Sequence, residues 1–214
     1  MLVVKEVKYT RDKQNFHYDF RLEKNEWLSV LGPSGSGKTT MLELVAGFLT
    51  PEEGDIFLEG QALISLPPGC RNLSYIFQNH GVFEHLSVQK NLDLCFHDRK
   101  ISSAEKKNLI LKMLENVKLQ DYFLERYPSQ LSGGEKSRLQ IARAMLRPCK
   151  LLLMDEPFSA LDQPLRQELL KLVHHLQTEQ KLIVVFVTHD EGDAHFNSSE
   201  ILKIQNGRGI LLRS

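Results

Sequence analysis

The sequence predicts an α/β fold in which a largely parallel sheet follows an antiparallel β segment and is interrupted by helices. Continuous apolar runs at residues 151–154 and 182–187 are typical of strands buried in a parallel sheet, and residues 27–31 form a further short, largely apolar strand. Apolar and polar residues alternate over residues 16–22, as in a strand with one buried face. From about residue 84 to 147 the pattern is mostly helical, which indicates a helical insertion into the α/β core.

The first elements are expected to form an antiparallel hairpin. Residues 2–9 should pair with residues 16–22 across a turn region at residues 11–15. Three further segments are expected: a turn at residues 50–54 and strands at residues 55–58 and 73–77.

Three segments have the periodicity of amphipathic helices. The first spans residues 39–49, and the second follows a capping box formed by Ser102 and Glu105. The third lies between the apolar runs at 151–154 and 182–187. Their apolar faces are Leu42, Val45, Ala46 and Leu49 in the first helix, Ile110, Leu114 and Val117 in the second, and Leu165, Leu169, Leu172, Val173 and Leu176 in the third.

Composition excludes several classes of protein. With 214 residues, 42% of them hydrophobic and 25% charged, the chain has the composition of an ordinary globular protein. Lysine plus arginine equals aspartate plus glutamate at 27 each, so no bulk basic field exists and no nucleic-acid partner is expected. The three cysteines form no CxxC pair, which argues against a zinc site or a disulfide framework and suits a reducing cytosol.

No membrane-spanning segment is expected. The apolar runs are far shorter than the roughly 20 residues that a bilayer helix needs, and the amino terminus lacks the pattern of a signal peptide. The chain is therefore expected to be soluble, and any role at a membrane would require a partner.

Residues 32–39, GPSGSGKT, match the GxxxxGK[ST] pattern of a phosphate-binding P-loop. Glycines let successive backbone N–H groups point at phosphate oxygens, while Lys38 can reach the β- and γ-phosphates and Thr39 can ligate Mg²⁺. A chance match in a chain of this length is on the order of one in a hundred, and the strand before and the helix after supply the required context. The predicted nucleotide-binding residues are Gly32, Pro33, Ser34, Gly35, Ser36, Gly37, Lys38 and Thr39.

The apolar run at residues 151–154 ends in two carboxylates, Asp155 and Glu156. We expect Asp155 to hold Mg²⁺, through water, and Glu156 to orient or deprotonate the water that attacks the γ-phosphate. A solvated acidic turn is the simpler alternative for such a pair, but the P-loop upstream favours the functional interpretation.

A third motif narrows the class of nucleotide-binding protein. Residues 131–135, LSGGE, followed by KSRLQIARAM, resemble the LSGGQ signature of the ABC ATPases. Gln78 resembles the Q-loop glutamine of that family, residues 159–162 (SALD) its D-loop, and His189 its switch histidine. Tyr9 stands where the family keeps an aromatic residue that stacks on adenine. The resemblance covers nearly the whole chain.

This resemblance implies one domain, residues 1–214, with a P-loop NTPase (RecA-like) core, an N-terminal antiparallel β subdomain and an inserted helical subdomain. The core would comprise about 1–83 and 148–214, and the helical part about 84–147. The implied activity is ATP hydrolysis with Mg²⁺. The implied catalytic residues are Glu156, His189, Gln78 and Lys38, the metal site is Thr39, Gln78 and Asp155, and nucleotide contacts beyond the P-loop are Tyr9, Thr40, Ser132, Gly133 and Gly134.

The resemblance also implies partners. ATP would lie between two subunits, with Ser132 and Gly134 of one facing the nucleotide on Lys38 of the other. A transmembrane permease would dock on residues 79–96, and Val82 and Phe83 are the interface candidates within an otherwise packed segment. A solute-binding protein would be a further partner. The expected location is cytoplasmic, peripheral on the inner face of the cell membrane.

The sequence around these motifs is most similar to importer cassettes of the thiamine, molybdate, iron and polyamine types. Among these, the thiamine type is the most similar by eye. The alternative is a non-transport ABC ATPase acting on DNA or ribosomes, but the chain lacks a long coiled-coil insertion and holds one cassette. An unrelated P-loop kinase or GTPase would leave LSGGE unexplained. The transported substrate, the direction of transport and homo- versus heterodimer stay open. Two departures from the family pattern are Glu135 in place of glutamine and the polar stretch at residues 197–199.

Overall fold

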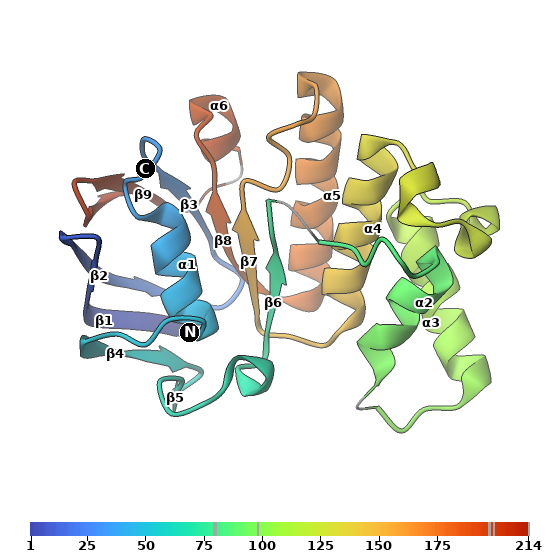
Figure 1. Ribbon diagram of the computed structural model, residues 1–214, viewed down its shortest axis with the longest axis horizontal. Coiled ribbons are helices and arrows are strands. Elements are labelled where there is room, and N and C mark those ends of the chain that lie inside the picture. Colours follow the sequence, from blue (N-terminus) through green and yellow to red (C-terminus); the bar gives the residue numbers. More distant parts are fainter. Residues whose placement is uncertain (79–80, 98, 197, 199, 214) are drawn as a thin grey trace. The chain divides into compact units, whose positions relative to one another are not determined.

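A computed structural model describes residues 1–78, 81–97, 99–196, 198 and 200–213 (Figure 1). Its strands form a 10-stranded mixed sheet in the order β5-β4-β1-β2-β10-β9-β3-β8-β7-β6. No helix in the described part of the chain is both long and apolar enough to cross a membrane. The polar stretch at residues 197–199 lies mostly outside the described residues, so its expected departure from the family stays a prediction.

The antiparallel part of the sheet begins with the predicted hairpin, which the structure confirms. Strand β1 (Leu2–Arg11) pairs with β2 (Gln14–Leu22), and the turn between them places Asp12 and Lys13 at φ of 50° and 66°. Positive φ at both central residues matches the right-handed twist of hairpin strands. Strand β4 (Glu53–Leu58) pairs with the other edge of β1, and β5 (Gln61–Ala62) completes this side.

The parallel part contains β3 (Trp27–Leu31), β8 (Ile183–Val187) and β7 (Leu151–Asp155), and every residue of these three strands is buried. This confirms the interpretation of the apolar runs. Strand β8 lies between β3 and β7 and is parallel to both. Because parallel strands end at the same edge of a sheet, the segments that follow β3, β7 and β8 lie together at that edge. The remaining strands are β6 (Leu73–Ile76), β9 (Glu200–Gln205) and β10 (Arg208–Arg213).

Helix α1 (Lys38–Ala46) is shorter than the predicted segment at residues 39–49. It ends because Gly47 turns into the left-handed region at φ 86°, where a glycine has no steric penalty. Strand boundaries also shift slightly: β4 begins at Glu53 rather than 55, and β6 ends at Ile76 rather than 77.

The sheet packs around α1. Buried side chains of this helix share one core cluster with residues of the antiparallel strands β1, β2 and β4 and of the parallel strands β3, β7, β8 and β9. Most residues of this helix are buried, although Thr39 is exposed, and this burial fixes both the helix and the loop that begins it. The helix residues in this cluster are Met41, Leu42, Leu44, Val45 and Ala46.

The segment expected to be mostly helical consists of separate helices joined by turns. One half of the predicted capping box is confirmed, since Oγ of Ser102 accepts a hydrogen bond of 3.1 Å from the N–H of Glu105. The α-helices after α1 are α2 (Val88–Asp93), α3 (Ser103–Asn116), α4 (Gly133–Leu146), α5 (Gln163–Gln180) and α6 (Glu191–Ala194). Short 3₁₀ helices are Pro68–Cys70, Leu94–Phe96, Asp121–Glu125 and Pro128–Gln130.

The chain divides into two compact units. Unit 1 comprises Met1–Tyr75, Lys150–Glu156 and Gln177–Ser214, and unit 2 comprises Ile76–Cys149 and Pro157–Leu176. Unit 1 holds the P-loop and the acidic strand end, and unit 2 holds the LSGGE motif. The core and helical subdomains expected from the family resemblance remain a prediction with their own boundaries.

Candidate active site

The loop between β3 and α1 can be built only with glycine at two positions. Gly37 has φ 109°, and a Cβ there would lie 2.5 Å from both the ring of Phe16 and the hydroxyl of Tyr18. A Cβ on Gly32 would lie 2.5 Å from the carbonyl oxygen of Ile204. The Tyr18 hydroxyl donates a 2.8 Å hydrogen bond to the Gly37 carbonyl, and burial raises the pKa of Tyr18, which keeps this donor protonated. Close contacts with the neighbouring strands therefore fix the backbone conformation of the loop.

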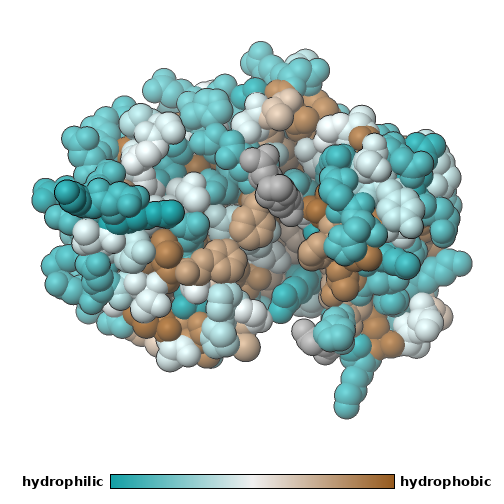
Figure 2. All heavy atoms as spheres, in the orientation of Figure 1, coloured by the Kyte–Doolittle hydropathy of each residue, from teal (hydrophilic) through white to brown (hydrophobic). Residues whose placement is uncertain are grey.

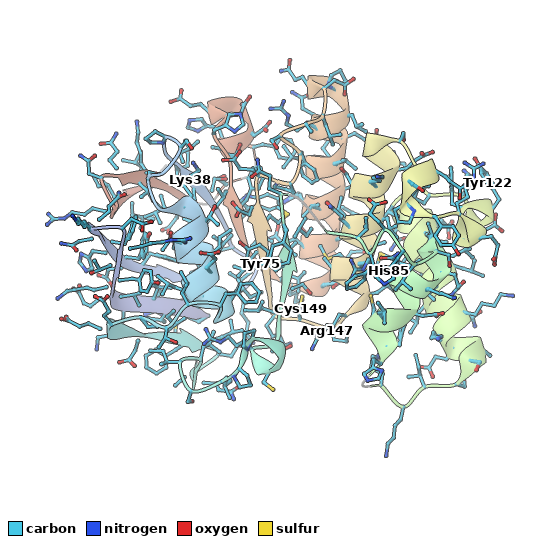
Figure 3. All side chains as sticks on the ribbon, in the orientation of Figure 1. Lys38, Tyr75, His85, Tyr122, Arg147 and Cys149 are labelled. Carbon is cyan, nitrogen blue, oxygen red and sulfur yellow. The ribbon has the colours of Figure 1, made fainter. Side chains whose placement is uncertain are left out.

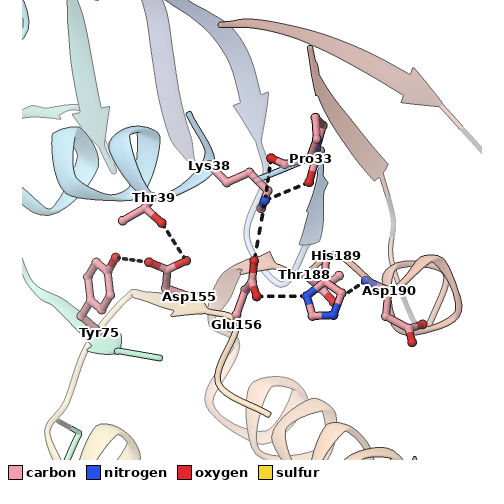
Figure 4. A network of polar contacts seen from close by, with 10 residues as sticks. Pro33, Lys38, Thr39, Tyr75, Asp155, Glu156, Thr188, His189 and Asp190 are labelled. Carbon is pink, nitrogen blue, oxygen red and sulfur yellow. Dashed lines mark hydrogen bonds and ion pairs between the residues drawn. The ribbon is translucent and has the colours of Figure 1, made fainter. Parts of the chain in front are cut away.

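Lys38, the first residue of α1, concentrates positive charge at this loop. Its Nζ donates to the carbonyl oxygens of Gly32 at 2.8 Å and Pro33 at 3.1 Å, and lies 3.6 Å from Oε1 of Glu156 (Figure 4). The side chain is only 7% exposed. Figure 3 shows Lys38 at the start of α1. A cation held at the N-terminus of a helix, beside a glycine-rich turn, is suited to bind phosphate.

Asp155 ends β7 and is joined to α1 and β6. Its Oδ1 accepts a 3.2 Å hydrogen bond from Thr39, and its Oδ2 accepts a 3.3 Å hydrogen bond from the Tyr75 hydroxyl (Figure 4). Burial raises the pKa of Asp155, while these two hydrogen bonds act in the opposite direction. Burial and the nearby Asp155 charge raise the pKa of Tyr75, so Tyr75 stays a neutral donor. The sequence analysis missed Tyr75, because a tyrosine in a short strand carries no pattern that distinguishes it from a packing residue.

The oxygen atoms of Thr39 and Asp155 fit Mg²⁺. Carboxylate and hydroxyl oxygens are its preferred protein ligands, and Mg²⁺ typically takes one or two carboxylates and completes its shell with phosphate oxygens and water. Among the described residues no group of three or more His, Cys, Asp and Glu could hold a metal by itself. Because Thr39 and Asp155 supply two ligands and phosphate oxygens can supply others, the pair fits a metal that binds together with a nucleotide.

Glu156 follows Asp155 in a strained backbone conformation, with φ of 43°. Its N–H donates to the carbonyl oxygen of Val187 at 3.0 Å, which ties the end of β7 to the end of β8. Its carboxylate lies between Lys38, at 3.6 Å, and the Nδ1 of His189, at 3.0 Å (Figure 4). The structure thus brings together Lys38, Glu156 and His189, three of the four residues expected to be catalytic, and their catalytic roles stay a prediction.

The remaining loop residues offer further polar groups. The hydroxyl of Ser36 is buried and has no hydrogen-bond partner among the described residues. A buried hydroxyl is normally paired, so this one fits a site that receives oxygen atoms of a ligand. Pro33, Ser34 and Gly35 are exposed, and Thr40 is buried inside α1. Tyr9 lies in β1, half-buried, and packs against the core cluster of unit 1.

The LSGGE motif in unit 2 forms the start of α4. Ser132 is the N-cap, and its Oγ accepts a 3.3 Å hydrogen bond from the N–H of Glu135. In return Oε2 of Glu135 accepts hydrogen bonds from the N–H and from the hydroxyl of Ser132, both at 2.7 Å. A Cβ on Gly134 would lie 2.7 Å from the side chain of Leu165, while Gly133 and Ser132 are exposed. The motif therefore presents exposed N-terminal groups of a helix, an arrangement suited to an anion.

Residues 83–87 are held by a buried side chain of unit 2. Gln78, two residues beyond the end of β6, is exposed. Asn91 is fully buried, accepts a 2.9 Å hydrogen bond from the N–H of Phe83, and donates to the carbonyl oxygens of Phe83, Leu86 and Ser87 at 3.0 to 3.1 Å. The sequence analysis missed Asn91, since an asparagine near the start of a helix usually indicates only a turn.

The expected interface pair is only partly correct. Val82 is buried, with 8% of its surface exposed, so it belongs to the core of unit 2 and is corrected as a docking residue. Phe83 is 43% exposed, and the guanidinium of Arg143 lies 4.6 Å from its ring centre. Hydrophilic side chains cover much of the face seen in Figure 2, with apolar side chains exposed in smaller groups.

A glycine-rich loop between a buried strand and a helix, with a lysine, a threonine and an acidic pair at the end of a nearby strand, defines a P-loop nucleoside triphosphatase. The model of the ABC transporter family matches residues 16–159, more than half of the chain. The chain belongs to the ABC transporter family and is an ATP-binding cassette of the ATPase class. The unrelated P-loop kinase or GTPase considered from the sequence is thereby excluded.

Two curated relatives show the kind of cassette this chain is similar to. The thiamine import ATP-binding protein ThiQ of Vibrio parahaemolyticus is 39% identical over 208 residues, which cover 97% of this chain and 88% of the relative. The spermidine/putrescine import ATP-binding protein PotA of Thermotoga maritima is 40% identical over 186 residues, which cover 87% of this chain and 50% of that relative.

The fold is similar to a solved ABC cassette. The dimeric structure of the bacterial ABC transporter cassette MJ0796 matches with a TM-score of 0.87 and 27% identity, and covers 100% of this chain and 98% of that one. The same cassette in a post-hydrolysis state with ADP and Pi matches with a TM-score of 0.84 and 28% identity, over the same shares of both chains. These matches confirm the predicted α/β cassette fold.

Proposed function

We propose that this chain is the ATP-hydrolysing subunit of a small-solute importer and that two copies close around ATP to drive a membrane permease. The observation that carries the proposal is the contact of Glu156 with both Lys38 and His189, beside the Thr39–Asp155 pair. The 39% identity with a thiamine import ATPase over 97% of the chain supports the importer class.

In this proposal the phosphates of ATP lie over residues 32–39. Backbone N–H groups of the loop and of the start of α1 bind phosphate oxygens. The ammonium group of Lys38 exchanges its hydrogen bonds to the carbonyl oxygens of Gly32 and Pro33 for contacts with the β- and γ-phosphates. Tyr9 stacks on the adenine, and Thr40 adds a contact. Mg²⁺ would be held by Thr39 and Asp155, with Gln78 as the further ligand that the family resemblance implies, and would supply positive charge that neutralises phosphate oxygens.

Glu156 acts on the attacking water. Its carboxylate accepts a hydrogen bond or a proton from that water, the water oxygen bonds to the γ-phosphorus, and the bond to the β-phosphate oxygen breaks to leave ADP. His189 holds the other carboxylate oxygen at 3.0 Å and keeps Glu156 directed at the site. The positive φ of Glu156 also restricts the directions in which its side chain can point.

The second half of each nucleotide site would come from a second copy of the chain. Ser132, Gly133 and Gly134 at the start of α4 supply an anion-binding helix terminus to the γ-phosphate held by the partner. Binding of ATP then favours the closed dimer, and hydrolysis releases it. The proposed partners are a transmembrane permease and a solute-binding protein, and the proposed location is the cytoplasmic face of the cell membrane.

Thiamine is the proposed solute, because the relatives named for thiamine import match over nearly the whole lengths of both chains. Spermidine or putrescine is the second candidate, because PotA is equally similar within the shared cassette. Selectivity among solutes would belong to the permease and the solute-binding protein.

The test is uptake by cells that lack the gene. We expect deletion to reduce uptake of labelled thiamine and leave labelled spermidine unaffected, and we expect the parent gene to restore thiamine uptake while Glu156→Gln fails to do so. If deletion reduced uptake of spermidine and not of thiamine, the solute would be a polyamine and not thiamine. Unchanged uptake of both would contradict the thiamine and polyamine assignments.

A further inference from the structure

The signature serine and Glu135 hold each other at the start of α4. The hydroxyl of Ser132 is 2.7 Å from Oε2 of Glu135, its backbone N–H is also 2.7 Å from that oxygen, and the N–H of Glu135 points back to Oγ of Ser132 at 3.3 Å. These bonds lower the pKa of Glu135, so its carboxyl is ionised at neutral pH. The family signature carries glutamine at this position, as the sequence analysis noted.

The hydrogen bonds decide what Ser132 can offer to an anion. A serine hydroxyl has one hydrogen to donate, and here that hydrogen points at the carboxylate of Glu135. The backbone N–H of Ser132 is used by the same oxygen atom. Hydrogen bonds to a charged acceptor are roughly twice as strong as neutral ones. A phosphate at this helix terminus must therefore take the hydroxyl hydrogen away from Glu135.

We propose that Glu135 is a positioning residue that holds the Ser132 hydroxyl away from the partner's γ-phosphate and thereby weakens the ATP-bound dimer of this chain. The inference rests on the proposed function, in which Ser132 of one copy meets the nucleotide of the other. The ATP-bound dimer would dissociate more readily, because the carboxylate of Glu135 competes with the γ-phosphate for the hydroxyl of Ser132.

Nearby positive charge compensates only in part. Arg126 and Arg138 lower the pKa of Glu135 as well, yet both guanidinium groups have other partners. Arg126 lies over the rings of Tyr122 and Phe123 at 5.2 and 4.7 Å, and Arg138 binds Glu168 at 3.1 Å. The carboxylate of Glu135 is partly exposed, so its repulsion of phosphate is screened by salt.

Glutamine is the variant that separates charge from folding. Both Glu and Gln form a capping box with a serine N-cap, so Glu135→Gln keeps the start of α4 while it removes the charge. Glu135→Asp keeps the charge on a shorter side chain. If the charge of Glu135 matters, Glu135→Gln should change dimerisation and Glu135→Asp should change it little. If only the shape of the side chain matters, Glu135→Asp should have the larger effect.

The experiment measures the dissociation constant of the dimer by sedimentation with Mg-ATP, in the Glu156→Gln background that holds ATP unhydrolysed. We expect Glu135→Gln to lower the dissociation constant about tenfold at low salt, which is about threefold for each of the two nucleotide sites and the size of a weak charge interaction at a protein surface. The difference should shrink at high salt, and Glu135→Asp should stay within about threefold of the parent. Thermal unfolding checks that all variants are folded.

Three results separate the inference from the proposed function. Equal dissociation constants for parent and Glu135→Gln, or a tighter dimer of the parent, overturn the role of Glu135. A difference that persists unchanged at high salt also overturns it, because a repulsion at an exposed carboxylate is screened. No ATP-dependent dimer in any variant contradicts the proposed function itself, and with it the inference.

Discussion

Glu156 and Asp155 are adjacent residues with opposite surroundings. Glu156 is strained at φ 43°, and its carboxylate contacts Lys38 and His189. Asp155 is 8% exposed and receives hydrogen bonds from Thr39 and Tyr75. The sequence predicted both carboxylates from the apolar strand before them, but it could not predict Tyr75, whose role depends on the order of strands in the sheet.

The buried charge of Asp155 should cost stability. Burial raises its pKa, and a carboxyl with a higher pKa in the folded chain makes the free energy of unfolding fall as pH rises through that interval. We therefore expect Asp155→Asn to raise the melting temperature of the nucleotide-free chain at neutral pH and to lose this advantage at acidic pH. The same variant should lose Mg²⁺-dependent hydrolysis.

Calorimetry across pH measures this effect, with Asp19→Asn as the control because Asp19 is exposed. The control should shift the melting temperature little at any pH. A lower melting temperature for Asp155→Asn at pH 7 would show that the charge stabilises the folded chain and would contradict the prediction.

At the scale of elements, the sequence predicted strands better than helix ends. Residues 27–31 are β3 residue for residue, because a strand buried on both faces needs a largely apolar segment, here with Ser29 as its one polar residue. Helix α1 ends at Gly47 although its apolar periodicity continues to Leu49, since backbone conformation at one glycine overrides the pattern. The short 3₁₀ helices carry no periodicity long enough to be read.

Asn91 shows how one polar side chain holds an element together. It bonds the N–H of Phe83 and three carbonyl oxygens of residues 83–87. We expect Asn91→Ala to lower the free energy of unfolding by about 2–4 kcal/mol, because several buried backbone groups lose their partner. Urea unfolding measures this, and Gln89→Ala is the control, since Gln89 bonds only Asp93 at 3.0 Å among the described residues. Equal stability of both variants would contradict the role of Asn91.

At the scale of the whole molecule, unit 1 holds the P-loop, the acidic pair and His189, and unit 2 holds Gln78, the signature motif and the proposed attachment site for the permease. Phe83 is the exposed residue on which attachment is expected to depend. We expect Phe83→Asp to leave ATP hydrolysis by the isolated chain unchanged, because Arg143 can pair with the new carboxylate, and to abolish solute uptake. Tyr122→Asp is the control, since Tyr122 is 60% exposed in the same unit. Loss of hydrolysis together with uptake would show that Phe83 supports the fold.

The most direct measurement of the central claim follows Glu156→Gln in the purified chain. Phosphate release should fall by on the order of 10²-fold or more, the usual contribution of a general base. With Mg-ATP the variant should sediment as a dimer of two 24.6 kDa chains, and without nucleotide as a monomer. Hydrolysis at the parent rate would contradict the assignment of Glu156, and a monomer under both conditions would contradict the account of two copies closing around ATP.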